Sequence, residues 1–294
     1  MSTPIAPHFL ASELGLNTSP ASALFHVIPV PLERSVSYGK GTQEGPAAIL
    51  EASQQLENWD GRSTPLELGI HTTDFIDCSG EIEQVLERIR KQTAVALETG
   101  KIPVLLGGEH TVTVGALEAV CGFFPEPVGL FYLDAHADLR ESYEGSRFSH
   151  ACVARRAHAD LGMELFQFGV RALSPEEVNY REKHNISHLD AAPFYQSASR
   201  ECCSLPPVFP HKIYLTLDVD GLDPSVIRAT GTPVPGGPAW HDTLTVIEKV
   251  IKGRTVVGFD VVELAPRPED HASSFAAAQL VYSVMGLIQR NRTH

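Results

Sequence analysis

Three short stretches of the sequence carry carboxylates and imidazoles; in two of them these residues alternate with apolar ones, and in the third two glycines precede them. Asp134-Ala135-His136-Ala137-Asp138 follows one apolar run, Asp218-Val219-Asp220 follows a second, and Gly107-Gly108-Glu109-His110 follows a third. In an extended backbone, residues i, i+2 and i+4 point to the same side. The side chains of each stretch that could bind a metal can therefore face one common site.

Such a set of side chains is expected to surround cations. Carboxylates that lie close together raise one another's pKa and oppose folding unless a cation neutralises them. Oxygen ligands with a little imidazole favour Mn²⁺ over Zn²⁺, which takes fewer ligands and often sulfur. The set suits two octahedral ions that share bridging carboxylates, and its members are His110, Asp134, His136, Asp138, Asp218 and Asp220. Because paired ions generate hydroxide from water at neutral pH, the sequence predicts two Mn²⁺ per chain and a hydrolytic reaction.

Each stretch alone also has an ordinary structural explanation. Asp134–Asp138 could form a solvated turn, Asp218 and Asp220 could cap a helix, and His110 could be a hydrogen-bonded core histidine. Three such stretches, each at the end of a separate apolar run, would rarely arise for structural reasons alone. We therefore favour the cation site.

The runs that precede these stretches indicate how they are positioned. Six runs rich in β-branched or aromatic residues are expected to be buried strands: Leu24–Val30, Ile102–Leu106, Val128–Asp134, Leu165–Val170, Ile213–Asp218 and Thr255–Val261. Helical periodicity in Glu81–Thr99 and Ser273–Arg290 alternates with them. This order predicts a single α/β domain of three α/β/α layers with a mostly parallel central sheet. Ligands bind at the carboxyl ends of strands in such sheets, where the three stretches lie.

Composition narrows the possible partners and compartments. A net charge of −13 argues against nucleic acid and anionic membranes, which require clustered Lys and Arg. The five cysteines have irregular spacing without a Cys-x-x-Cys pair, which argues against disulfides and fits the cytosol. The N-terminus lacks the features of a signal peptide, and the apolar runs are about strand length, too short to span a membrane. We expect a soluble cytoplasmic protein, with residues 1–22 as an N-terminal arm and residues 23–294 as the catalytic domain.

Taken together, the motifs resemble those of the ureohydrolase family, which includes arginases and agmatinases. That family has a Gly-Gly-Asp-His turn, Asp-Ala-His-x-Asp, Ser-x-Asp-x-Asp-x-x-Asp-Pro before a Gly-Thr-Pro stretch, and a later Asp-x-x-Glu. The matching segments are Gly107–His110, Asp134–Asp138, Thr216–Pro224 with Thr230–Gly237, and Asp260–Glu263. Val36–Gly39 through Gly45–Ile49 also resembles the family, so the likeness runs from about Pro29 to near the C-terminus. It implies an arginase-like fold and a homo-oligomer, either a trimer or a hexamer.

The resemblance also implies how the metal ligands are divided. Asp134 and Asp218 would bridge the two Mn²⁺ ions. One ion would be bound in addition by His110 and Asp138, and the other by His136 and Asp220.

Further roles follow from the same resemblance. Asp138 would also orient the attacking hydroxide, and Glu263 would bind the guanidinium group through charge-assisted hydrogen bonds. His150 would shuttle a proton to the departing amine, since an imidazole titrates near neutral pH. Asp223 would hold its loop rather than bind metal. Without the resemblance, Glu263 would be read as a surface or capping carboxylate.

The sequence departs from the family pattern at three places. Glu109 stands where the family has Asp, Thr216 where it has Ser, and Ile227-Arg228-Ala229 where many members have Ala-Pro-Gly. None of these changes removes a predicted ligand. The last could reshape the rim of the site, and the role of Glu109 is open.

The predicted reaction is agmatine plus water to putrescine plus urea, because the chain most resembles short bacterial and archaeal agmatinases. Guanidinobutyrate, N1-aminopropylagmatine, arginine and formiminoglutamate are alternative substrates with the same mechanism. A single-zinc deacetylase and a catalytically inactive binding homologue are remote alternatives, since no predicted ligand is lost. The loop 139–149 would contact the far end of the substrate. Glu141 and Glu144 could attract a cationic tail there, whereas Arg140 and Arg147 leave a carboxylate possible.

Overall fold

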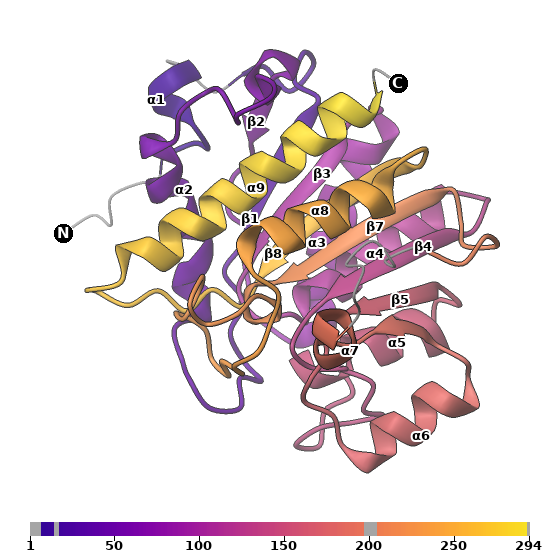
Figure 1. Cartoon of the computed structure of the whole chain (residues 1–294). Helices are drawn as coiled ribbons and strands as arrows, with labels where there is room; N and C mark the ends of the chain where they lie inside the picture. Colours follow the sequence, from indigo (N-terminus) through magenta and orange to yellow (C-terminus); the bar gives the residue numbers. More distant parts are fainter. Residues whose placement is uncertain (1–6, 15–17, 197–204, 293–294) are drawn as a thin grey trace.

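A computed structural model describes residues 7–14, 18–196 and 205–292 and contains one central sheet (Figure 1). Its strands are all parallel and lie in the order β2-β1-β3-β8-β7-β4-β5-β6. Their bounds are β1 Phe25–Val30, β2 Ile70–Thr72, β3 Ile102–Gly107, β4 Val128–Leu133, β5 Glu164–Phe168, β6 Ser187–Leu189, β7 Lys212–Asp218 and β8 Thr255–Val262. The three strands that precede the polar stretches, β3, β4 and β7, lie at the middle of the sheet.

The predicted strands are confirmed to within a residue or two at each end. Only the two edge strands of the described sheet, β2 and β6, were not predicted. Each has three residues, too few for a periodic pattern to distinguish it from a loop. The inner strands are buried on both faces, which explains why they read as continuous apolar runs.

Helices cover both faces of the sheet. Their bounds are α1 Ala11–Leu14, α2 Gly45–Ala52, α3 Ile82–Glu98, α4 Val112–Phe123, α5 Val153–Ala159, α6 Pro175–Lys183, α7 Ala191–Gln196, α8 Trp240–Ile251 and α9 His271–Arg292. In Figure 1, α8 and α9 lie in front of the sheet, and α3 and α4 lie behind it. The predicted three-layer α/β/α architecture is therefore confirmed.

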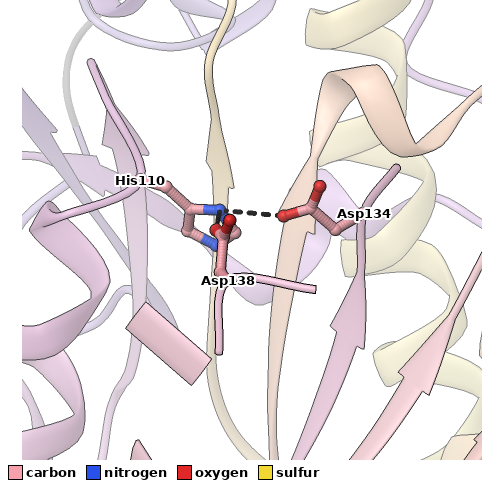
Figure 2. Close-up of side chains that lie close together, drawn as sticks. All are labelled: His110, Asp134 and Asp138. Carbon is pink, nitrogen blue, oxygen red and sulfur yellow. Dashed lines mark ion pairs between the residues drawn. The ribbon is translucent and has the colours of Figure 1, made fainter. Parts of the chain in front are cut away.

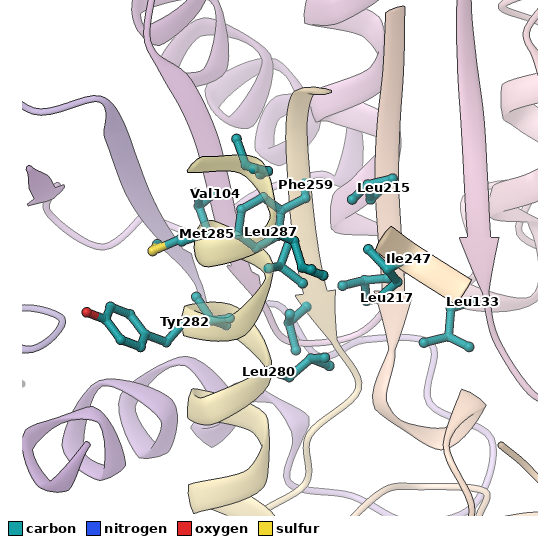
Figure 3. Close-up of a cluster of buried hydrophobic side chains, with 14 of the residues drawn as sticks. Val104, Leu133, Leu215, Leu217, Ile247, Phe259, Leu280, Tyr282, Met285 and Leu287 are labelled. Atoms are coloured by element: carbon teal, nitrogen blue, oxygen red, sulfur yellow. The ribbon is translucent and has the colours of Figure 1, made fainter. Parts of the chain in front are cut away.

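A separate hydrophobic cluster fills the space on each side of the sheet. Side chains of α2, α8 and α9 pack on one face, and side chains of α3, α4 and α5 pack on the other. Figure 3 shows Met285 of α9 beside Val104 of β3 and Phe259 of β8 in the first cluster. Consecutive residues of one strand enter opposite clusters, as Val104 and Leu105 do. The two layers hold the strand ends in fixed relative positions.

Helix α9 differs from the prediction in one respect. It has 22 residues, and its most apolar 18-residue window has a mean hydropathy of 1.2, so by length and composition alone this one described helix could cross a membrane. Most of it is buried inside the domain, with 67% of its most apolar window covered. The helix holds no continuous apolar run longer than a strand, but it is apolar around most of its circumference and packs against one face of the sheet. Phe275, expected on its buried face, is 40% exposed near the start of the helix.

The described part of the N-terminal segment is packed onto the domain. Phe9 and Leu10 are fully buried, and their N–H groups donate to Thr72 Oγ1 and Ser53 Oγ, each at 2.9 Å. Residues 1–6 and 15–17 of the predicted arm lie outside the described residues. Of the five cysteines, three lie in the described residues and are free.

Candidate metal centre

The turn after β3 is held between extensions of its two neighbouring strands. The N–H groups of Gly108 and Glu109 donate to Val30 and Leu32, each at 2.8 Å, on the β1 side. On the β8 side, Gly108 accepts from the N–H of Glu263 at 2.8 Å. A Cβ at position 108 would collide with the carbonyl oxygen of Leu32, so glycine is required there. This close approach carries His110 to the middle of the sheet edge.

The stretch after β4 positions three candidate ligands. Asp134 is fixed by its own turn, since its Oδ1 accepts from the N–H of His136 at 2.6 Å. Asp138 adopts φ 49°, a left-handed conformation that is uncommon outside glycine. Its Oδ2 accepts from the Tyr132 hydroxyl at 2.7 Å. The backbone therefore leaves the extended form at Asp138, and Tyr132 fixes the carboxylate.

The stretch after β7 forms a 3-10 turn over Val219–Gly221. Asp218 caps this turn, with its Oδ1 accepting from the N–H of Asp220 at 2.8 Å. Asp220 Oδ1 in turn accepts from the N–H of Ala135 at 3.1 Å, which ties the β7 turn to the β4 turn. One oxygen of each aspartate is thus used to build the turn, and the other points to the cluster.

Arg171 holds the same turn from behind. Its guanidinium donates to the carbonyl oxygens of Asp220 at 2.7 Å, Gly169 at 2.8 Å and Val234 at 2.8 Å. It also reaches the carbonyls of Gly221 and Leu222 at 3.0 and 3.1 Å. One side chain therefore joins three loops, including the loop that carries Asp220.

The six predicted ligands converge on two adjoining sets that share Asp134. His110 Nδ1 lies 3.2 Å from Asp134 Oδ2, 3.3 Å from Asp218 Oδ2 and 3.4 Å from Asp138 Oδ2 (Figure 2). In the second set, His136 Nδ1 lies 3.1 Å from Asp220 Oδ2 and 3.4 Å from Asp134 Oδ1. The potential ligand atoms in each of the sets His110/Asp134/Asp138 and Asp134/His136/Asp220 lie within 4.8 Å of one another.

The hydrogen bonds of His110 show which ring nitrogen faces the carboxylates as a lone pair. Thr216 gives its only hydroxyl hydrogen to Asp260 Oδ1 at 2.6 Å. The Thr216 oxygen, 2.8 Å from His110 Nε2, must therefore accept from Nε2–H. In the neutral ring, Nδ1 would then present a lone pair to three carboxylate oxygens, an arrangement that a bound cation or a proton relieves. A buried partner that fixes the tautomer in this way is typical of metal-binding histidines.

The pKa shifts of the clustered groups express the same conflict of charge. Burial, followed by the charge of Asp134, raises the pKa of Asp138 well above its usual range. Burial and the charge of Asp220 raise the pKa of Asp218 in the same way. Burial opposes protonation of His136, but Asp134 and Asp220 outweigh it and raise the pKa of His136 to about 12. Asp134 Oδ2 is buried and accepts no hydrogen bond from the described residues. The cluster thus requires positive charge, and its oxygen and imidazole donors fit divalent cations.

Glu263 lies beside the cluster at the end of β8. Its φ of 66° turns the chain sharply, and its Oε1 accepts from the N–H of His110 at 2.6 Å. Burial raises the pKa of Glu263 well above the usual range. Glu263 is 8% exposed, so this carboxylate is not a surface group.

An open cavity of about 340 Å³ lies over the cluster, and His150 lines it together with His136 and Asp138. Both ring nitrogens of His150 meet serine hydroxyls: Nδ1 lies 3.1 Å from Ser35 Oγ, and Nε2 lies 2.8 Å from Ser37 Oγ. Burial lowers the pKa of His150, so the ring favours its neutral form more than a solvated histidine does. The structure therefore places this predicted residue at the mouth of the cluster.

The loop predicted to contact the substrate is only partly in the cavity. Among the four charged residues named for it, Arg140 lines the cavity. Glu141 instead pairs with Arg155 and Arg156, at 2.8 and 2.9 Å, and Arg147 pairs with Asp160 at 2.8 Å. Glu144 is exposed in a turn and does not line the cavity. Glu141 and Arg147 are thus engaged in ion pairs outside the cavity.

Other residues singled out in the sequence lie away from the cluster. Asp223 Oδ2 accepts from the N–H groups of Gly236 and Gly237 at 2.8 and 3.2 Å, and so holds its loop. Arg228, part of the third departure from the family pattern, pairs with Asp270 at 3.1 Å and does not line the cavity.

Several residues that support the site were not recognised in the sequence. Arg171, Tyr132 and Ser35 each hold a site residue or its turn through hydrogen bonds. Only Tyr132 carried a signal, because it lies within the strand that leads to Asp134. Ser35 and Arg171 are distant in sequence from the groups they hold, so no local pattern identifies them.

Comparison with known proteins agrees with this geometry. The family model described as the arginase family matches residues 23–286. The N(1)-aminopropylagmatine ureohydrolase of Synechocystis sp. is 35% identical, covering 95% of this chain and 92% of its own length. The agmatinase of Pyrococcus horikoshii is 32% identical, with 90% and 92% covered. The crystal structure of agmatine ureohydrolase of Thermoplasma volcanium matches with a TM-score of 0.87 and 29% identity, covering 99% of this chain and 97% of that one.

Proposed function

This chain belongs to the arginase family and is a hydrolase of the ureohydrolase class, and we propose that it converts agmatine and water into putrescine and urea. One observation carries the proposal. Two sets of carboxylates and imidazoles share Asp134 at the carboxyl end of the sheet, directly beneath a cavity. Membership of the family supplies the class of reaction, and the cavity supplies room for a small guanidino compound.

We propose two Mn²⁺ ions as the cofactor. His110, Asp134, Asp138 and Asp218 would bind one ion, and Asp134, His136, Asp218 and Asp220 would bind the other. When bound, such a pair supplies Lewis-acid activation of water at neutral pH. The protein contributes donors that are already fixed by hydrogen bonds, so that little reorganisation is needed on binding.

The remaining residues would bind the substrate and move protons. Glu263 uses Oε1 to accept from His110, and Oε2, which accepts no hydrogen bond from the described residues, would accept from the guanidinium group. His150 would pass a proton from its Nε2 to the amine that leaves. Asp138, held by Tyr132, would orient the attacking water through a hydrogen bond.

The cavity wall favours a substrate without a carboxylate. Arg140 is the only arginine that lines the cavity among the described residues. Its charge is balanced by Glu177 at 3.9 Å, and its guanidinium lies 5.2 Å from the centre of the Tyr143 ring. A carboxylated substrate such as arginine or guanidinobutyrate would have to compete with Glu177 for this side chain.

N1-aminopropylagmatine is a second candidate, and a specific observation favours it. Three relatives that are 35 or 36% identical to this chain carry the name N(1)-aminopropylagmatine ureohydrolase. Agmatine and its aminopropyl derivative share the guanidinium end, so the same catalytic groups would serve both.

We also propose the domain organisation of the protein, its compartment and its oligomeric state. Residues 23–294 would form the catalytic domain and residues 1–22 an N-terminal arm, and the chain would assemble into a cytoplasmic trimer or hexamer. Light scattering of the purified protein would measure the mass of the assembly, and a monomer would contradict this proposal.

A panel of guanidino compounds tests the function directly. Urea release from agmatine, N1-aminopropylagmatine, arginine and guanidinobutyrate should be compared under one set of conditions, with the metal content determined on the same sample. We expect two divalent ions per chain and a kcat/KM for agmatine or its aminopropyl form well above that for arginine. A tenfold preference for a carboxylated compound, or about 1.4 kcal/mol of transition-state binding, would refute the agmatine assignment. One zinc per chain would refute the two-metal site.

A further inference from the structure

Glu109 is a buried acid next to His110, and its carboxylate points away from the metal cluster. It is fully buried and accepts three hydrogen bonds from a single segment. Its Oε2 accepts from the N–H groups of Arg34 and Ser35 at 2.5 and 2.6 Å, and its Oε1 accepts from the Ser35 hydroxyl at 2.9 Å. The acid therefore fixes both the backbone and the side chain of Ser35.

The Ser35 hydroxyl also contacts His150 twice. Its oxygen lies 3.0 Å from the backbone N of His150 and 3.1 Å from the ring Nδ1. A hydroxyl has one hydrogen and two lone pairs. Because Glu109 takes the hydrogen, both contacts with His150 must be made by the oxygen as acceptor. The Nδ1 atom of His150 must therefore carry a hydrogen.

We propose that Glu109 is a positioning residue that fixes His150 in the Nδ1–H tautomer through the Ser35 hydroxyl, leaving the lone pair on Nε2. This inference rests on the proposed role of His150 as the group that moves a proton. Nε2 faces Ser37, which lines the cavity, so the atom left free to gain and lose a proton is the one on the substrate side. A fixed tautomer removes the alternative in which Nε2 already holds its hydrogen and cannot accept another.

The other contacts of the ring agree with this assignment. Ser37 Oγ lies 2.8 Å from Nε2, and its hydroxyl can donate to the lone pair there. Ser149 Oγ lies 3.3 Å from Nδ1 and already accepts from the N–H of Ala151 at 3.4 Å. It has a second lone pair that can accept from Nδ1–H alongside Ser35. Donation from Ser149 to a bare Nδ1 is the competing arrangement.

The substitution Glu109→Gln should invert the tautomer. The N–H groups of Arg34 and Ser35 require an acceptor at the Oε2 position, so the amide oxygen should occupy it. The amide NH₂ group then faces the Ser35 oxygen and donates to it. Ser35 is left with its own hydrogen to give, and His150 Nδ1 becomes the acceptor. The ring hydrogen should move to Nε2.

Neutron diffraction from deuterium-exchanged crystals of the full-length protein reads the tautomer directly. At a pH where His150 is neutral, we expect deuterium on Nδ1 in the wild-type protein and on Nε2 in Glu109→Gln. Deuterium on Nε2 of the wild type, or an unchanged tautomer in the variant, would overturn the inference. This measurement needs no turnover, so it stands even if the proposed substrate is wrong.

A double-mutant cycle separates positioning from a purely structural effect. Glu109→Gln should lower kcat by roughly 10–100-fold, with KM for agmatine and the metal content unchanged. In a His150→Asn background the same change should alter kcat by less than about two-fold, because the group it positions is gone. An equal loss in both backgrounds would show that Glu109 acts on the fold or on His110.

Ser35→Ala provides a second route to the same answer, should Glu109→Gln fold poorly. It removes the bridge while leaving the acid and the backbone N–H groups in place. We expect a loss of kcat similar to that of Glu109→Gln, and no further loss when Glu109→Gln is added. Additive losses would contradict transmission through the Ser35 hydroxyl.

Discussion

Two histidines of the site are each held by a hydrogen-bond chain that runs from a buried carboxylate through a hydroxyl group to the imidazole ring. Asp260, the Thr216 hydroxyl and His110 form one chain, and Glu109, the Ser35 hydroxyl and His150 form the other. In each, a buried carboxylate takes the hydroxyl hydrogen, so the hydroxyl oxygen accepts from the imidazole. The first chain orients a predicted metal ligand, and the second orients the predicted proton shuttle.

The two hydrogen-bond chains differ in which structural elements hold their members at hydrogen-bonding distance. Thr216 and Asp260 are register partners on β7 and β8, so the sheet itself sets the first chain. Asp260 also accepts from the hydroxyls of Thr113 and Tyr214, each at 3.0 Å, inside the core. In the second chain, Ser35 lies in a loop that Glu109 holds through three hydrogen bonds, and His150 lies at the edge of the cavity. Strand ends therefore position the proposed metal ligand, and a loop positions the proposed proton shuttle.

The largest loss of activity should come from removing a carboxylate at the strand ends. Asp218→Ala removes a proposed bridging carboxylate whose Oδ2 lies 3.3 Å from His110 Nδ1. We expect urea release to fall to background and at least one ion to be lost, because both ions would depend on this residue. Kinetics and elemental analysis of the same sample check this result. Asp223→Ala, which alters an acid of the neighbouring loop outside the cluster, is the matched control and should retain both metals.

The next largest loss of activity should come from replacing His150, the histidine that the Ser35 loop holds. His150→Asn keeps a polar side chain but removes the titrating nitrogen. We expect kcat to fall by roughly 10²–10⁴-fold, the usual range for a positioned acid–base group, with both metals retained. Turnover close to that of the wild type would mean that His150 does not move the proton. Loss of metal would mean that the two regions are not separable.

Glu263 is tied to the strand-end region, because it accepts from the N–H of His110, and it is the residue that we propose to bind the guanidinium group. Glu263→Gln keeps the shape and an acceptor for His110 N–H but removes the charge. A hydrogen bond to a charged group contributes about 1.5–3 kcal/mol, so kcat/KM for agmatine should fall by roughly 10–100-fold. Steady-state kinetics measures the loss, and unchanged metal content would exclude an indirect effect through His110. Unchanged kcat/KM would remove Glu263 from substrate binding.

The smallest effect on activity should come from weakening the hydrogen-bond chain of Asp260, Thr216 and His110 without removing a proposed metal ligand. Asp260→Asn leaves the Thr216 hydrogen without its charged acceptor, and we expect metal affinity to fall by roughly 10–100-fold. Excess Mn²⁺ should then restore most of kcat, which a titration of activity against metal concentration checks. Thr216→Ser keeps the hydroxyl and should change metal affinity by less than about two-fold, whereas Thr216→Val should behave like Asp260→Asn. Equal behaviour of the Ser and Val variants would contradict the role of the hydroxyl.

The same contrast explains what could be predicted from the sequence. The strand-end residues obey a local rule, since alternation in the stretch that follows β4 predicts that Asp134 and His136 face one side. The inner strands are continuous apolar runs. This hydrophobic pattern predicted the parallel sheet, and the sheet in turn predicted that the six side chains converge. The fold class and the family were therefore predictable.

What escaped prediction depends on contacts between distant segments. Ser35 is 74 residues from Glu109, and Arg171 is 63 residues from Val234, so no periodicity relates either pair. The exposure of Phe275 depends on where α9 begins to pack, which helical periodicity alone does not give. Glu141 and Glu144 were reasonable candidates by charge, yet the arginines that engage Glu141 lie on the helix after the loop.

Arg171 bears on how this site could diversify. Its guanidinium joins the turn that carries Asp220 to the segment at Val234 through carbonyl groups alone, so these bonds fix the backbone path at Val234 without depending on its side chain. An insertion or deletion near Val234 would pull on the turn of a proposed metal ligand through Arg171, whereas a change at the turn Tyr143–Ser146, which closes on itself through its own backbone hydrogen bonds, would not. We therefore expect evolvability to be unequal around the cavity. New substrate preferences should accumulate by length changes on the Arg140 side and by side-chain replacement only on the Val234 side.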